Sequence, residues 1–151
     1  MEDLLVRLAV VVAVLGGVAL VGAWWRRREG QVRRPAGAGF SPAELRAVGL
    51  GDDTVAVRGL LLTSPTCAPC RTVKRVLTEV GDARAGFAWV AVDVAHHLEL
   101  ARHHHVLRVP TLFLVDADGR VLARTSGVPA VRDIARVVDQ PAGDDARGAL
   151  T

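Results

Sequence analysis

The sequence predicts a mixed α/β domain that follows one membrane-spanning helix. Three observations support this fold class. An uncharged apolar run occupies the N-terminal region, and the rest of the chain alternates short aliphatic segments with segments of helical periodicity. The last two aliphatic segments are separated only by the turn sequence Asp116 to Gly119. This order predicts a mixed sheet of about four or five strands with helices on both faces.

The N-terminal run is long enough to cross a bilayer. The 18 residues from Leu8 to Trp25 carry no charge, and a transmembrane helix needs about 20 mostly apolar residues. Trp24 and Trp25 stand where an aromatic belt is expected. A cleaved signal peptide is the alternative, but the chain begins Met1-Glu2-Asp3 and has no small-residue cleavage site after the run. We therefore expect a single-pass protein of the cell membrane that contacts lipid through residues 4–25.

The charges that flank this run predict its orientation. Arg26, Arg27 and Arg28 follow it directly, and Arg33 and Arg34 come soon after. Positive flanks stay in the cytoplasm, so the domain is expected on the cytoplasmic side, with an extracytoplasmic domain as the alternative. The net charge of +3 comes without a basic stripe interleaved with aromatic residues, so no nucleic-acid partner is expected.

Four regions are expected along the chain. They are a membrane anchor at 1–29, a linker at 30–39, the folded domain at 40–140 and a flexible tail at 141–151. The linker is rich in Gly, Pro and Arg. Ser41-Pro42-Ala43-Glu44 then has the pattern of a capping box, which predicts a short helix that ends near Gly49. Val55 to Thr63 is aliphatic and β-branched, and predicts a buried strand.

The central part of the domain predicts a helix between two parallel strands. From Pro69 onward the apolar residues fall on one helical face, namely Val73, Val76, Leu77 and Val80. Gly81 is the predicted end of this helix, and Phe87 to Val94 is the next strand. Two strands joined by a crossover helix are expected to pair in parallel.

The last part of the domain predicts a helix, a hairpin and a closing helix. Leu98 to about Val106 is the expected helix, and Thr111 to Val115 the expected strand. Asp116-Ala117-Asp118-Gly119 forms the hairpin turn, with Arg120 to Thr125 as the partner strand. Pro129 to Val138 carries its apolar residues on one face and predicts the closing helix.

The two cysteines of the chain, Cys67 and Cys70, are the candidate catalytic residues. A C-x-x-C pair between a strand and a helix places the first sulfur at the helix N-terminus, where unpaired N–H groups and the helix dipole stabilise a thiolate. Cys67 is then expected to attack a substrate disulfide, and Cys70 to resolve the mixed disulfide. Thr66, Ala68 and Pro69 complete the motif. No metal ligand or cofactor is assigned.

With these residues, the sequence from Val55 to Val138 resembles the thioredoxin superfamily. Thr66-Cys67-Ala68-Pro69-Cys70 is similar to the family's W-C-G-P-C motif, and Arg108-Val109-Pro110-Thr111 resembles its cis-proline segment. The resemblance implies a thioredoxin-like three-layer fold in which Pro110 is cis and packs beside Cys67. It also implies that Val109, Pro110 and Thr111 bind an extended protein substrate, in a protein-disulfide oxidoreductase that serves cell redox homeostasis.

Three positions differ from the family pattern. Thr66 stands where the family has Trp, Leu61 where it has a buried Asp, and the position near Trp89 where it often has Lys. The proton relay to the resolving thiol is therefore expected to be absent, with water, Thr63 or Ser64 in its place. The reductase direction is favoured, with a protein disulfide as substrate and a thiol-reducing partner of unknown identity.

Two other functions stay open. Ser64-Pro65-Thr66-Cys67 also resembles the motif start of membrane-anchored accessory proteins in cytochrome and amine-dehydrogenase maturation. Alternatively, the Cys pair and the histidine cluster could serve metal binding; the histidines are His96, His97, His103, His104 and His105. The simpler interpretation of these histidines is a polar, partly exposed helix face. A non-catalytic adaptor is disfavoured, because both cysteines are present at the predicted helix start.

Overall fold

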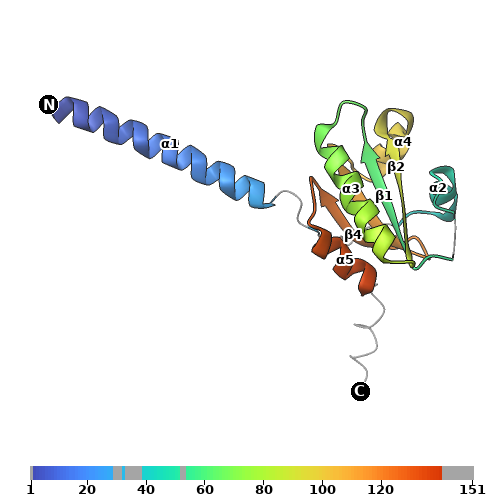
Figure 1. Ribbon diagram of the computed structural model, residues 1–151. Helices are drawn as coiled ribbons and strands as arrows, with labels where there is room; N and C mark the ends of the chain where they lie inside the picture. Colours follow the sequence, from blue (N-terminus) through green and yellow to red (C-terminus); the bar gives the residue numbers. More distant parts are fainter. Residues whose placement is uncertain (1, 29–31, 33–38, 52–53, 141–151) are drawn as a thin grey trace, which may run out of the picture.

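The structure is a computed structural model that describes residues 2–28, 32, 39–51 and 54–140. An N-terminal helix is followed by a domain in which helices lie against a sheet (Figure 1). Most of the predicted linker and the whole predicted tail at 141–151 lie outside the described residues.

The elements follow the predicted order. They are α1 (Glu2–Arg28), α2 (Pro42–Ala47), β1 (Val57–Thr63), α3 (Ala68–Ala83), β2 (Phe87–Asp93), the 3₁₀ turn η1 (Val94–His96), α4 (Leu98–His103), β3 (Thr111–Asp116), β4 (Val121–Ser126) and α5 (Val131–Asp139).

The strands of the described chain form one four-stranded sheet in the order β2-β1-β3-β4. β1 is parallel to β2 and antiparallel to β3, and β3 is antiparallel to β4. The predicted parallel pair and hairpin are therefore confirmed. Because β3 runs against β1, its first residue Thr111 lies opposite Leu62, at the end of β1 that leads to the cysteines.

The two faces of the sheet bury different residues of the same strands. Val57 and Leu61 of β1 pack with α3 and α5 in one core cluster. Leu60 and Leu62 point to the other face, where they pack with Phe40, α2 and α4. This alternation is what a strand covered on both sides requires, and it confirms the predicted sheet with helices on both faces.

The ends of two helices differ from prediction. Gly81 does not end α3, which continues to Ala83; Gly81 lacks the positive φ found at Gly49, so the backbone remains helical there. α4 ends at His103, before the predicted Val106, because His105 takes a φ of 49°. Val106 N–H then bonds the carbonyl of Ala101 at 2.7 Å, which closes the helix in a Schellman motif.

Candidate active site

Cys67 and Cys70 form a disulfide at the start of α3, with an S–S distance of 2.03 Å and a Cα–Cα distance of 5.4 Å. Cys67 is the N-cap residue of the helix and is partly exposed, whereas Cys70 lies one turn in and is 2% exposed. The turn that delivers Cys67 is closed by its N–H bond to the carbonyl of Ser64 at 3.2 Å. The more exposed of the two cysteines, Cys67, is thus at the positive end of a 16-residue helix.

The segment around Pro110 comes to the same end of the sheet. The Val109–Pro110 bond is cis, and Pro110 is buried directly before β3. Its carbonyl accepts the N–H of Gly127 at 3.0 Å, and Thr111 Oγ1 donates to the carbonyl of Arg108 at 2.7 Å. Since β1 ends where β3 begins, the cysteine turn and the Val109–Thr111 segment lie at the same end of the sheet.

A family model described as Thioredoxin matches residues 58–140, which is more than half of the 151-residue chain. The chain belongs to the thioredoxin family. The match begins in β1 and covers the cysteine pair, the Pro110 segment and the hairpin. Comparison with the curated proteins gave no match.

Solved thioredoxin structures share the fold. Chloroplastic thioredoxin z is 24% identical with a TM-score of 0.56, and the alignment covers 69% of this chain and 93% of that one. A mutant thioredoxin from Halobacterium salinarum is 21% identical with a TM-score of 0.55, over 68% of this chain and 95% of that one. Thioredoxin membership and the cysteine pair together support a thiol–disulfide oxidoreductase in general terms.

The positions that depart from the thioredoxin pattern have apolar surroundings. Leu61 is fully buried in the cluster with α3 and α5, and Trp89 packs partly buried against the same cluster. Thr63 Oγ1, one of the expected substitutes for a proton relay, donates to the carbonyl of Ser64 at 3.4 Å. The positions of Leu61 and Trp89, where the thioredoxin pattern has ionisable residues, therefore carry apolar side chains in this protein.

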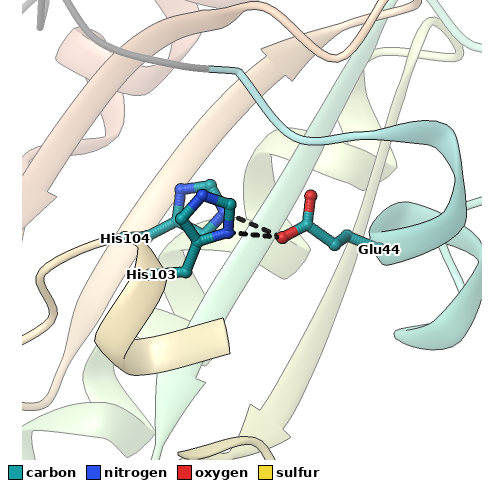
Figure 2. Close-up of side chains that lie close together, drawn as sticks. All are labelled: Glu44, His103 and His104. Carbon is teal, nitrogen blue, oxygen red and sulfur yellow. Dashed lines mark hydrogen bonds and ion pairs between the residues drawn. The ribbon is translucent and has the colours of Figure 1, made fainter. Parts of the chain in front are cut away.

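Two of the histidines, His103 and His104, contact Glu44 of α2, on the face of the sheet covered by α2 and α4 (Figure 2). His104 is 8% exposed, so the interpretation of all five histidines as an exposed polar face is wrong for this one. Within the described residues, the group placed to hold a metal contains neither cysteine. The structure therefore does not bring the cysteines and the histidines together in one metal site, as the metal-binding alternative expected.

The electrostatics of this cluster follow from burial and hydrogen bonding. Burial works to raise the pKa of Glu44, but hydrogen bonds from the N–H and hydroxyl of Ser41, with His103 and His104 nearby, bring that pKa to about 2. Burial lowers the pKa of His104 below its usual value, although the Glu44 carboxylate opposes this shift. Both effects favour an ionised Glu44 beside a neutral His104 at pH 7.

Sequence reasoning found Glu44 as a capping residue but missed its place in this cluster. The Ser41 and Glu44 capping box is present as predicted. The contact between Glu44 and His103 spans 59 positions of sequence, and it arises because α2 and α4 cover the same face of the sheet. The adjacent histidines were the available signal, and their acidic partner depends on the tertiary fold.

Proposed function

We propose that this protein is a membrane-tethered thioredoxin that reduces protein disulfides with Cys67 as the attacking thiol and Cys70 as the resolving thiol. The observation that carries the proposal is the disulfide at the start of α3, with Cys67 accessible and Cys70 buried. An accessible thiolate at a helix N-terminus is suited to attack, and a neighbouring buried thiol is suited to intramolecular resolution.

The reaction begins from the dithiol form. The Cys67 thiolate attacks one sulfur of the substrate disulfide and forms a mixed disulfide, and the other substrate sulfur leaves as a thiolate. The Cys70 thiolate then attacks the Cys67 sulfur, which releases the second substrate thiol and leaves the Cys67–Cys70 disulfide seen here. The substrate gains two electrons, and a dithiol partner returns two electrons to the enzyme.

We assign substrate binding to Val109, Pro110 and Thr111. They lie at the end of the sheet to which the cysteine turn leads, and an extended substrate segment would pair with the backbone of this segment through hydrogen bonds. With Leu61 in place of an acidic residue, deprotonation of Cys70 would depend on water or a nearby hydroxyl. We therefore expect the resolving step to be more sensitive to pH than attack by Cys67.

The membrane tether is supported by α1, whose segment Val6–Trp24 has a mean hydropathy of 2.4 and is not buried against the rest of the chain. By length and composition this helix suits a membrane span or a signal sequence. The arginines that follow it favour a domain on the cytoplasmic side, where thiols are kept reduced and a reductase direction is expected.

Insulin reduction by the full chain, with dithiothreitol as electron donor, tests the proposed activity. The wild type should accelerate insulin precipitation, and both Cys67→Ser and the double variant Cys67→Ser/Cys70→Ser should fall to the uncatalysed rate. Cys70→Ser should accumulate a mixed disulfide with a protein substrate, because the resolving thiol is gone. Activity in Cys67→Ser equal to that of the wild type would refute the proposed roles.

A further inference from the structure

We propose that Glu44, His103 and His104 form a binding site for a divalent ion of the zinc type, separate from the redox centre. His103 Nδ1 lies 3.0 Å from Glu44 Oε1, and His104 Nε2 lies 3.4 Å from the same oxygen. Figure 2 shows both rings turned toward this single carboxylate oxygen. All three potential ligand atoms lie within 4.8 Å of one another.

These distances fit the coordination shell of a small cation. Zinc binds His nitrogen and carboxylate oxygen at about 2.0–2.2 Å, so tetrahedral neighbours are about 3.3 Å apart. The two separations from Glu44 Oε1, 3.0 and 3.4 Å, are close to this value. The His103 side chain is 62% exposed, so it has room to turn toward an ion while the other two ligands keep their places.

The buried polar atom at the centre of this group is Nε2 of His104. Glu44 Oε1 lies 3.4 Å away, but no group of the described residues makes a hydrogen bond of good geometry to this nitrogen. A buried polar atom without a partner costs free energy, and a metal ion at this point would satisfy its lone pair. The ring is held in place by Phe40, which stacks on it at a centroid distance of 3.7 Å and an interplanar angle of 16°.

The surrounding contacts orient the other groups as a metal site requires. Ser41 donates to Glu44 Oε2 from its N–H at 2.8 Å and from its hydroxyl at 2.7 Å, which leaves Oε1 facing the imidazoles. Arg124 donates to the carbonyls of His104 and His105 at 3.1 and 2.7 Å, and so fixes the loop that carries the ligands. Such supporting hydrogen bonds orient the ligands of known metal sites.

The ligand set selects the class of ion. Two imidazoles and one carboxylate suit zinc and neighbouring first-row ions, whereas magnesium and calcium prefer oxygen ligands alone. A hollow of about 690 Å³ beside the cluster, lined in part by Glu44 and His103, gives an ion access and leaves room for a water as a further ligand. A bound ion would cross-link α2, which carries Glu44, to the end of α4, which carries His103.

The test is zinc binding by the full chain, purified in detergent without a histidine tag and in the disulfide form, so that no thiolate competes. Titration against a chelating dye should give one zinc per chain and a rise in melting temperature. His103→Ala and Glu44→Gln should each weaken binding at least about tenfold. His96→Ala, which removes an exposed histidine of the same hollow, is the matched control and should bind as the wild type does.

Substitution of cobalt gives a readout that a structural defect would not mimic. The wild type should show the visible bands of four-coordinate cobalt without a thiolate band in the near ultraviolet, and Cys67→Ser/Cys70→Ser should give the same spectrum. The proposal is overturned if the oxidised wild type binds no zinc, if His103→Ala binds it equally well, or if binding appears only after reduction of the disulfide. Insulin reduction is measured separately, so neither proposal depends on the other.

Discussion

At the scale of single residues, Arg58 is a charged side chain that the fold buries almost completely. It lies on β1 and is 1% exposed. Its guanidinium donates to the carbonyl of Leu50 at 2.9 Å and to that of Asp116 at 2.7 Å, and it also bonds the carbonyl of Ala117. One side chain thus links the segment after α2 to the hairpin turn. The five donors of a guanidinium make this possible.

Replacement of Arg58 by Leu should lower the free energy of unfolding by about 3 kcal/mol, because buried carbonyls lose charged hydrogen bonds and stay unpaired. Urea denaturation of the oxidised full chain measures this. Arg132→Leu, at a side chain that is 84% exposed, is the matched control and should change the value by less than about 0.5 kcal/mol. Equal effects of the two substitutions would show that the Arg58 contacts contribute little.

Gly119 is a second position where one residue decides local structure. It has a φ of 81° in the turn between β3 and β4, and its carbonyl accepts the N–H of Phe40 at 2.7 Å. A Cβ at Gly119 would overlap the carbonyl oxygen of Phe40, whereas a Cβ at Gly49, with a φ of 82°, would meet open space. Substitution at Gly49 therefore introduces backbone strain alone, whereas substitution at Gly119 introduces backbone strain and steric overlap.

Gly49→Ala should cost about 1 kcal/mol, from the positive φ alone. Gly119→Ala should cost clearly more, since the backbone at Phe40, which leads into α2, must also move. Thermal melting of both variants compares them directly, and the second should melt at the lower temperature. If the two melt together, the close approach of Phe40 to the turn does not contribute to stability.

At the scale of elements, a bidentate ion pair joins the ends of α3 and α5. Arg84 Nε lies 2.6 Å from Asp139 Oδ1, and the second nitrogen lies 3.0 Å from Oδ2. The hydrogen bonds from Arg84 lower the pKa of Asp139 below its usual 3.8. A lowered carboxyl pKa means that the pair stabilises the fold above about pH 4, and that this stabilisation is lost as the pH falls through the folded value.

Asp139→Asn should therefore lower the melting temperature slightly at pH 7, and the difference from the wild type should vanish in acid. High salt should also reduce the difference, because both side chains are accessible to solvent. Asp133→Asn is the control, since Asp133 makes only long ion pairs, with Arg136 at 3.8 Å and Arg132 at 3.9 Å. A difference that persists in acid would mean that Asp139 acts through something other than its charge.

The elements also show which features the sequence could predict. The capping box at Ser41, the parallel pair around the crossover helix and the hairpin turn at Gly119 follow from patterns along the sequence, and each was predicted correctly. The pairing of β1 with β3 was not predicted. The early end of α4 was not predicted. It depends on the positive φ of His105, and a histidine in the sequence does not by itself indicate a left-handed conformation. Contacts between distant elements, such as Glu44 with His103 and Arg58 with Asp116, follow only from the assembled sheet.

At the scale of the whole molecule, the apolar helix α1 and the thioredoxin domain differ in where their apolar side chains lie. The domain buries its apolar side chains in its own core, and α1 does not. The described side chains of Val6–Trp24 are exposed, with a mean hydropathy of 2.4. A core helix of a soluble protein would instead be buried against its own domain. The proposed tether supplies lipid as the missing apolar environment.

Leu15→Arg/Val18→Arg tests the tether, because each arginine near the middle of a span costs about 2.5–3.5 kcal/mol on the insertion scale. The wild type should stay in membranes after an alkaline wash, and this variant should be released. Leu15→Ala/Val18→Ala keeps the helix apolar and should remain with the membranes. The intact mass of the wild type must include residues 1–25, since a cleaved signal sequence would lose them. Release of the wild type by the wash, or a mature chain without this segment, would contradict the tether. The redox activity of Cys67 and Cys70 would be unaffected by that outcome, because insulin reduction tests it independently.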